Sequence, residues 1–196
     1  MLSQAERKRP GGLQESGQKS VKKTRSTGRE PAPSFLAIDF ETANHSRDSA
    51  CAVGLVRVEG LRIVRREHHL IRPPSTWFVF TYLHGIAWED VIYEPTFEGL
   101  WPSIEPLFEG VDFLVAHNAP FDRSVLRACC ETAEVEYPDI PFECTVKTAR
   151  RVWDIFPTKL PDVCSRLDIP LRHHEAASDS EACARIMIEA LKGERG

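Results

Sequence analysis

The stretch FLAIDFETAN, residues 35–44, places two carboxylates at the end of an apolar run. Residues 35–38 predict a buried strand, and Asp39 and Glu41 follow where a core strand should continue. Because side chains alternate between the faces of a strand, Asp39 and Glu41 point the same way. Two like charges so close repel each other and are costly to remove from water without a partner. The pair indicates either the polar end of a strand or one part of a divalent cation site.

Size and composition predict one ordinary globular domain. The chain has 196 residues, of which 42% are hydrophobic and 28% are charged. No apolar run is long enough for a membrane span, and the basic N-terminus lacks the apolar segment of a secretory signal. The six cysteines form no C-x-x-C pair, so we expect free thiols in a reducing cytosol and a cytoplasmic protein.

The net charge of −4 is unevenly distributed along the chain. Residues 1–33 carry a net charge of +5 and almost no apolar side chains, which predicts a disordered basic tail. Residues 34–196 carry a net charge of −9 and form the predicted domain. An acidic body argues against tight nucleic-acid binding by electrostatics alone, but not against a site where metal ions neutralise the local charge.

From Ser34 onward, the pattern predicts an α/β domain with a mixed sheet. Two β-rich runs after the first strand meet at Glu59–Gly60, which predicts a hairpin. Strands and helices then alternate. A helix over residues 96–108 contains two prolines, so we expect it to be kinked or broken. The last helix is predicted over residues 176–192.

Two further aspartates have a matching position in their helices. In LVAHNAPFDRSVL, residues 114–126, Asp122 lies near the start of a predicted helix and on its apolar face. In HHEAASDSEACARIMIEAL, residues 173–191, Asp179 has the same place. Each alone is explained as an acid that complements the helix dipole. Together with Asp39 and Glu41, they suit two hard cations with open positions for a phosphate.

These stretches resemble the three exonuclease motifs of the DEDDh 3′–5′ exonucleases, a family that includes the proofreading epsilon subunit of bacterial DNA polymerase III. The resemblance covers about residues 34–192 and includes YLHGI at residues 82–86. It implies a ribonuclease H-like fold, with a mixed five-stranded sheet flanked by helices. In one branch of the family, a histidine lies five residues before the last aspartate. His174 has this spacing from Asp179, so the chain matches the histidine branch.

The resemblance also implies the catalytic groups. Two Mg²⁺ or Mn²⁺ ions would be bound by Asp39, which bridges both, together with Glu41, Asp122 and Asp179.

His174 would act as the general base, since an imidazole titrates near neutral pH. We expect the carboxylates nearby to favour its protonated form. The adjacent His173 is assigned no partner.

Substrate contacts follow from the same resemblance. Leu83 and His84 hold the terminal nucleotide, and Thr42 offers it a backbone N–H. Phe121 either packs against a base or belongs to the core. The aromatic side chains of residues 77–82 are interpreted as a local core under their loop, although they could stack on bases.

The predicted function is 3′–5′ exonuclease action on single-stranded DNA, with release of 5′-mononucleotides. An exoribonuclease that trims RNA 3′ ends is the alternative, because the motifs do not distinguish the two sugars. An inactive nucleic-acid-binding module is disfavoured, because no metal ligand or histidine is missing. The expected partner is a nucleic-acid 3′ end. A DNA polymerase or repair partner stays open, and no membrane contact is expected.

Overall fold

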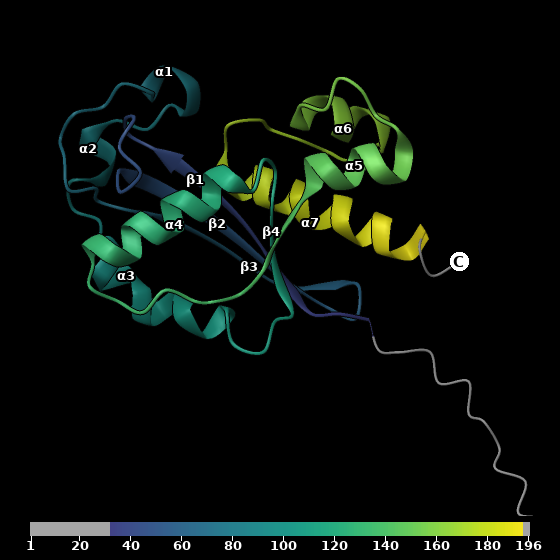
Figure 1. Ribbon diagram of the computed structural model, residues 1–196. Helices are drawn as coiled ribbons and strands as arrows, with labels where there is room; N and C mark the ends of the chain where they lie inside the picture. Colours follow the sequence, from purple (N-terminus) through teal and green to yellow (C-terminus); the bar gives the residue numbers. More distant parts are fainter. Residues whose placement is uncertain (1–31, 194–196) are drawn as a thin grey trace, which may run out of the picture. The chain divides into compact units, whose positions relative to one another are not determined.

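The computed structural model describes residues 32–193, so nearly all of the predicted tail lies outside the described residues. Five strands form one sheet in the order β3-β2-β1-β4-β5 (Figure 1). Strands β1 to β3 are antiparallel neighbours, whereas β4 and β5 run parallel to β1. This confirms the predicted mixed five-stranded sheet. The strands are β1 Phe35–Thr42, β2 Ala50–Glu59, β3 Arg62–Leu70, β4 Phe113–Ala116 and β5 Phe142–Cys144.

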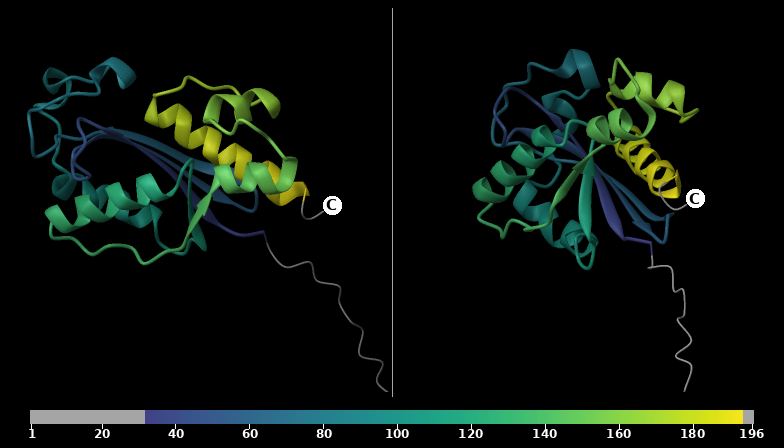
Figure 2. Two further views of the ribbon diagram at one scale, coloured as in Figure 1. Left: turned by 45° about the horizontal axis from the view of Figure 1, so that its top comes forward. Right: turned by 45° about the vertical axis from the view of Figure 1, so that its right-hand side comes forward.

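Helices cover both faces of the sheet (Figures 1 and 2). Helices α3 and α4 pack on one face, and α5, α6 and α7 pack on the other. The helices are α1 Thr81–His84, α2 Trp88–Val91, α3 Phe97–Ile104, the 3-10 turn η1 Glu105–Leu107, α4 Pro120–Thr132, α5 Thr145–Trp153, α6 Leu160–Arg166 and α7 Ala176–Gly193. The predicted helix over 96–108 is indeed broken, because α3 gives way to η1 after Ile104.

Strand β1 lies in the middle of the sheet and takes part in both cores. Leu36 and Ile38 contribute to the core under α3 and α4, whereas Phe35 and Ala37 contribute to the core under α7. All four are fully buried, and each large side chain removed from water contributes about 1.5–3 kcal/mol. The alternation fixes the direction of the residues that follow: odd positions face α7, so the residues at 39 and 41 reach the N-terminal end of that helix.

The six cysteines are free and buried. Burial raises the pKa of the Cys51 and Cys129 thiols to about 12, which keeps them protonated and unreactive. Within residues 32–193, no helix has the length and apolar character needed to cross a membrane.

Candidate active site

A pocket of about 300 Å³ lies at the C-terminal end of β1. It brings together residues far apart in the sequence, from β1, from α1, from the start of α4 and from the segment before α7. Eight of the nine residues predicted for the site line it, namely Asp39, Glu41, Thr42, Leu83, His84, Phe121, His174 and Asp179. The ninth, Asp122, is buried beneath the pocket with 2% of its surface exposed.

Three carboxylates meet in the pocket. Oxygen atoms of Asp39, Glu41 and Asp179 lie within 4.8 Å of one another. Burial, followed by the charge of Asp122, raises the pKa of Asp39 well above its usual value. Burial and the charge of Asp179 raise the pKa of Glu41 to about 7. Ionising these crowded, buried carboxylates therefore costs free energy, and a bound cation would offset that cost.

Asp122 is tied to the backbone of β1. Its Oδ1 accepts a hydrogen bond from the Phe40 N–H at 3.1 Å. Burial outweighs this hydrogen bond and raises the pKa of Asp122 to about 8. The Phe40 N–H therefore fixes the position of the carboxylate, but its hydrogen bond offsets only part of the free energy that burial adds to ionising Asp122.

The two oxygens of Asp179 have different surroundings. Oδ2 accepts a hydrogen bond from the His174 backbone N–H at 3.1 Å and lies 2.9 Å from His173 Nδ1. Oδ1 is buried and has no hydrogen-bond partner among the described residues. A buried carboxylate oxygen without a partner is costly and rare in native proteins. Hard divalent cations such as Mg²⁺ and Mn²⁺ prefer oxygen ligands, so this carboxylate set fits such an ion.

The two adjacent histidines correct two expectations. His173 has a partner after all, because its ring contacts Asp179. The pKa of His174 is lowered rather than raised, because burial and the neighbouring His173 outweigh the attraction of Asp179. The two rings stack with centroids 3.9 Å apart, and His174 has a left-handed backbone, with φ of 67°. This conformation is uncommon for a residue with a side chain, and the N–H of the same residue is the one that reaches Asp179.

His84 connects α1 to the end of β1. Its Nδ1 accepts a hydrogen bond from the Ile86 N–H at 3.1 Å, so its Nε2 carries the proton that it donates to the Thr42 carbonyl at 3.2 Å. Burial lowers the pKa of His84, which favours this neutral form. The β1–β2 register shifts between Glu41 and Thr42, so the strand is irregular beside the pocket.

Phe121 has one of its two predicted roles, the contact with the core. It packs against the core under α4 and also lines the pocket, and the Arg47 guanidinium lies 4.6 Å from the centre of its ring. The expectation for the aromatic loop holds only in part. Phe78 packs in a small local core, but Trp77 and Tyr82 are 62% and 77% exposed.

Gly54 was not predicted as a site residue, yet the site depends on it. It lies on β2 directly opposite Asp39. A Cβ atom at this position would lie 2.0 Å from the Ala176 carbonyl oxygen and 2.6 Å from Ser180 Oγ. Only a glycine therefore allows the first turn of α7 to approach the sheet closely enough to bring Asp179 to Asp39. A glycine inside an apolar strand is a known sign of close backbone approach.

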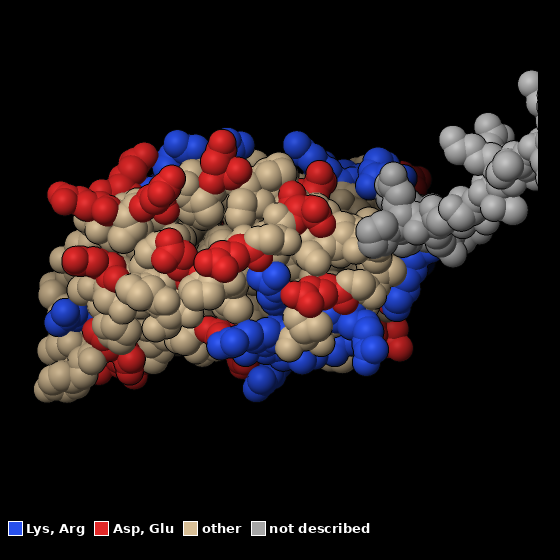
Figure 3. Space-filling model, turned by 90° about the horizontal axis from the view of Figure 1, so that it is seen from below, with Lys and Arg blue, Asp and Glu red and all other residues tan. Residues whose placement is uncertain are grey.

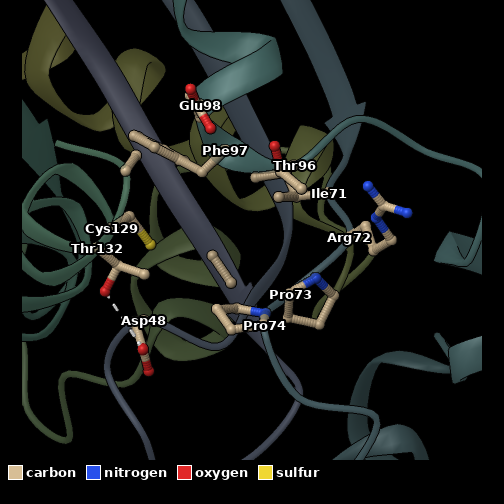
Figure 4. A pocket seen from close by; sticks show the side chains of 12 residues that line it. Asp48, Ile71, Arg72, Pro73, Pro74, Thr96, Phe97, Glu98, Cys129 and Thr132 are labelled. Carbon is tan, nitrogen blue, oxygen red and sulfur yellow. Dashed lines mark hydrogen bonds between the residues drawn. The ribbon is translucent and has the colours of Figure 1, made fainter. Parts of the chain in front are cut away.

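A second hollow, of about 200 Å³, lies between the start of α3 and the end of α4 (Figure 4). Its lining is largely apolar, with Ile71, Pro73 and Phe97 among the contacts. Its Asp48 carboxylate accepts a hydrogen bond from the Thr132 hydroxyl at 3.3 Å. This hollow brings no group of carboxylates together, unlike the pocket at the end of β1.

The fold places an acidic pocket at the end of β1, and the chain belongs to the exonuclease family. A family model described as exonuclease, RNase T, matches residues 36–187. Exodeoxyribonuclease 10 of Escherichia coli is 30% identical over 169 residues, which cover 79% of this chain and 67% of that protein. The PolC-type DNA polymerase III of Thermotoga maritima is 27% identical over 162 residues. That match covers 81% of this chain but only 12% of the polymerase.

Solved structures share the fold. Exonuclease X in complex with 5′ overhanging duplex DNA matches with a TM-score of 0.68 and 24% identity, over 83% of this chain and 93% of that one. The nuclease domain of 3′hExo, a DEDDh family member bound to rAMP, matches with a TM-score of 0.70 and 19% identity, over 82% and 92%. These similarities confirm the predicted family resemblance and the ribonuclease H-like fold.

Proposed function

We propose that this chain is a metal-dependent 3′–5′ exonuclease that degrades single-stranded DNA from a free 3′-OH and releases 5′-mononucleotides. The observation that carries the proposal is the carboxylate cluster at the end of β1, whose member Asp179 has a buried oxygen, Oδ1, without a hydrogen-bond partner among the described residues. The relationship to Exodeoxyribonuclease 10 of Escherichia coli supports DNA as the substrate.

Asp39, Glu41, Asp122 and Asp179 are the residues that would hold two Mg²⁺ or Mn²⁺ ions. Such ions, when bound, lower the pKa of a ligated water and stabilise negative charge on the leaving oxygen. Asp39 has the central place, because the charges of Glu41, Asp122 and Asp179 all act on it.

His174 takes a proton from the attacking water. Its lowered pKa leaves the ring neutral at physiological pH, as a general base requires. His173 and the His174 backbone N–H hold Asp179 Oδ2, which leaves Oδ1 available as a cation ligand. Oδ2 of Asp179 is thus bound by the protein, and Oδ1 would bind a cation.

The opposite wall of the pocket binds the terminal nucleotide. Leu83 is 43% exposed at the rim and offers an apolar contact, and Phe121 offers a ring face. His84 acts on Thr42 by holding the end of β1 in place. The match to PolC-type polymerases supports a DNA polymerase or repair complex as the setting, and the buried free thiols support the cytoplasm.

A digestion of 5′-labelled DNA and RNA of one sequence tests the proposal. With Mg²⁺ we expect a descending ladder from DNA, slower degradation of RNA, and no products in EDTA. Asp39→Asn, purified in parallel, controls for a contaminating nuclease. Immediate release of the labelled nucleotide would show the opposite polarity, full activity in EDTA would exclude the metal mechanism, and faster RNA degradation would favour the exoribonuclease.

A further inference from the structure

A groove of about 500 Å³ lies beside the active site, between the first turns of α4 and the junction of β5 with α5. The starts of α4 and α5 lie next to each other in all the ribbon views (Figures 1 and 2). The groove is lined by Pro120, Arg123 and Arg127 on one side and by Phe142 and Lys147 on the other. It therefore combines three cationic side chains with an aromatic ring.

These three cations are not neutralised by the protein. Arg123, Arg127 and Lys147 are exposed, and none of them forms an ion pair with a residue of the described part of the chain. Among the described residues, the Arg127 guanidinium lies 4.6 Å from the centre of the Tyr137 ring, a contact that leaves its charge unpaired.

Basic side chains at the other edge of the sheet behave differently. Arg66 on β3 and Arg185 on α7 both bind Glu181, at 2.7 and 2.6 Å. Figure 3 shows acidic and basic side chains interspersed on the face seen from below, so that face is not uniformly basic. In a domain with excess negative charge, a groove with three unpaired cations is suited to a polyanion.

The groove adjoins the candidate active site at the first turn of α4. Pro120 lines the groove, whereas the next residue, Phe121, lines the catalytic pocket. Consecutive residues of this turn thus line the two sites. Arg123 and Arg127 are one helical turn apart, roughly 5–6 Å between their Cβ atoms, which suits neighbouring phosphates of an extended strand. Phe142 is half-buried and presents a ring on which a base can stack.

We propose that this groove binds the phosphodiester backbone of the substrate strand on the 5′ side of the nucleotides in the active site. The inference rests on the proposed function and extends it: the enzyme would grip a strand several nucleotides long, and a short substrate would miss these contacts. Lys and Arg contacts to phosphates contribute affinity that falls with salt and does not depend on sequence.

The test compares Arg123→Ala/Lys147→Ala with a matched control, Arg62→Ala/Arg65→Ala on β3 at the opposite edge of the sheet. Both double variants lose two positive charges. Fluorescence anisotropy measures Kd for 5′-labelled single strands of about 20 and about 3 nucleotides, lengths above and below a typical single-strand site. Hydrolysis of the p-nitrophenyl ester of thymidine 5′-monophosphate reports the active site alone.

We expect the groove variant to weaken binding of the long strand about 10-fold or more at low salt, with less than about a 2-fold change for the short strand. The slope of log Kd against log salt concentration should flatten by about 1.4, since each lost phosphate contact contributes about 0.7 for single strands. Hydrolysis of the ester should match the parent.

Equal Kd values for the groove variant and the parent on the long strand would overturn the proposal, as would an equal loss in the β3 control. The groove would be assigned to a protein partner instead if the groove variant kept the DNA affinity of the parent but lost affinity for an acidic peptide. If the parent fails to hydrolyse the ester with Mg²⁺, the proposed function fails, and the Kd comparison still decides the role of the groove.

Discussion

Helices α4 and α7 both deliver an aspartate from their first turn to the end of β1, but they hold it differently. Asp122 of α4 is fixed by the main chain of β1, through the Phe40 N–H. Asp179 of α7 is fixed by the segment that precedes its own helix, through His173 and the His174 N–H, and keeps Oδ1 free. The α4 side thus belongs to the framework of the sheet, whereas the α7 side is set by residues that also take part in the proposed chemistry.

The difference teaches where the site can be perturbed selectively. A substitution at His173, His174 or Asp179 should alter cation binding and catalysis with little effect on the sheet. A substitution at Asp39, which interacts with the aspartates of both helices, should remove activity. It should also stabilise the metal-free fold, because fewer carboxylates are then crowded together. The predictions below follow this division, from the largest expected effect to the smallest.

Asp39→Asn should have the largest effect, because the charges of Asp122 on α4 and Asp179 on α7 both act on Asp39. Activity with Mg²⁺ should fall by about 10³-fold or more, since a metal site contributes several kcal/mol to transition-state stabilisation. The metal-free variant should melt at a higher temperature than the parent at pH 8, because asparagine carries no charge that folding must bury or neutralise. Parallel turnover and thermal-unfolding measurements check the loss of activity and the rise in melting temperature. Retained activity would show that Asp39 is not a metal ligand.

Alanine substitutions at the two histidines before α7 should differ in which property they change and by how much. His174→Ala should lower kcat by about 10²–10⁴-fold, the usual contribution of a general base, with little change in Kd for DNA. His173→Ala should weaken metal affinity and activity about 10- to 100-fold, as expected for an outer partner of a ligand. His173→Gln should recover part of the loss. Kinetics and metal titrations check this, and equal effects of the two alanine variants would contradict the assigned roles.

Gly54→Ala should displace α7 and Asp179 but leave the Asp122 contact with β1 in place. The added Cβ would clash with the Ala176 carbonyl oxygen at 2.0 Å, so α7 must shift away from β2. We expect a loss of about 1–3 kcal/mol in stability from overpacking, together with weaker metal binding. Gly99→Ala on α3 is the matched control, since its Cβ would meet its nearest neighbour at 3.5 Å. If the two variants unfold at the same urea concentration, the close approach at Gly54 is not limiting.

The sequence was sufficient for the architecture and for the identity of the acidic residues. The alternation along β1 and the apolar stripes that begin at Asp122 and Asp179 depend only on the local period of each element. The second oxygen of Asp179 and the partner of His173 could not be predicted, because they depend on the left-handed turn at His174.

Gly54 is an intermediate case. A glycine within an apolar strand signals close approach, but nothing in the local sequence identifies the distant helix that approaches it. The lowered pKa of His174 was missed for a similar reason. Its burial and its stacking on His173 are properties of the folded pocket, and they outweigh the nearby carboxylate.

The smallest predicted effect concerns pH. Glu41 and Asp122 have pKa values of about 7 and 8, against ordinary values of 4.5 and 3.8. Between its ordinary and its raised pKa, each carboxyl is protonated in the folded protein and ionised in the unfolded chain. The stability that these two groups confer on the metal-free protein therefore falls as pH rises towards 8 and levels off above it. His117, with its pKa lowered to about 4, has the opposite influence only below its ordinary value of 6.5.

The window from pH 6.5 to pH 8 therefore isolates the carboxylates. Urea unfolding in EDTA should show a lower midpoint at pH 8 than at pH 6.5. The decrease should be smaller in Asp122→Asn, and Mg²⁺ should reverse it in the parent. A stability that rises across this window would contradict the raised pKa values.

Calorimetric titration of Mn²⁺ into the parent and into Asp179→Asn at pH 7 tests the central claim that the two helices and β1 form one cation site. Repeating the titration in two buffers with different ionisation enthalpies counts the protons released. We predict saturable binding with release of about one proton or more per protein, because ligation deprotonates carboxylates that are partly protonated at this pH. Asp179→Asn should bind at least ~10-fold more weakly, since it replaces a carboxylate ligand with a neutral amide. Absence of saturable binding, binding without proton release, or unchanged affinity in Asp179→Asn would contradict the account.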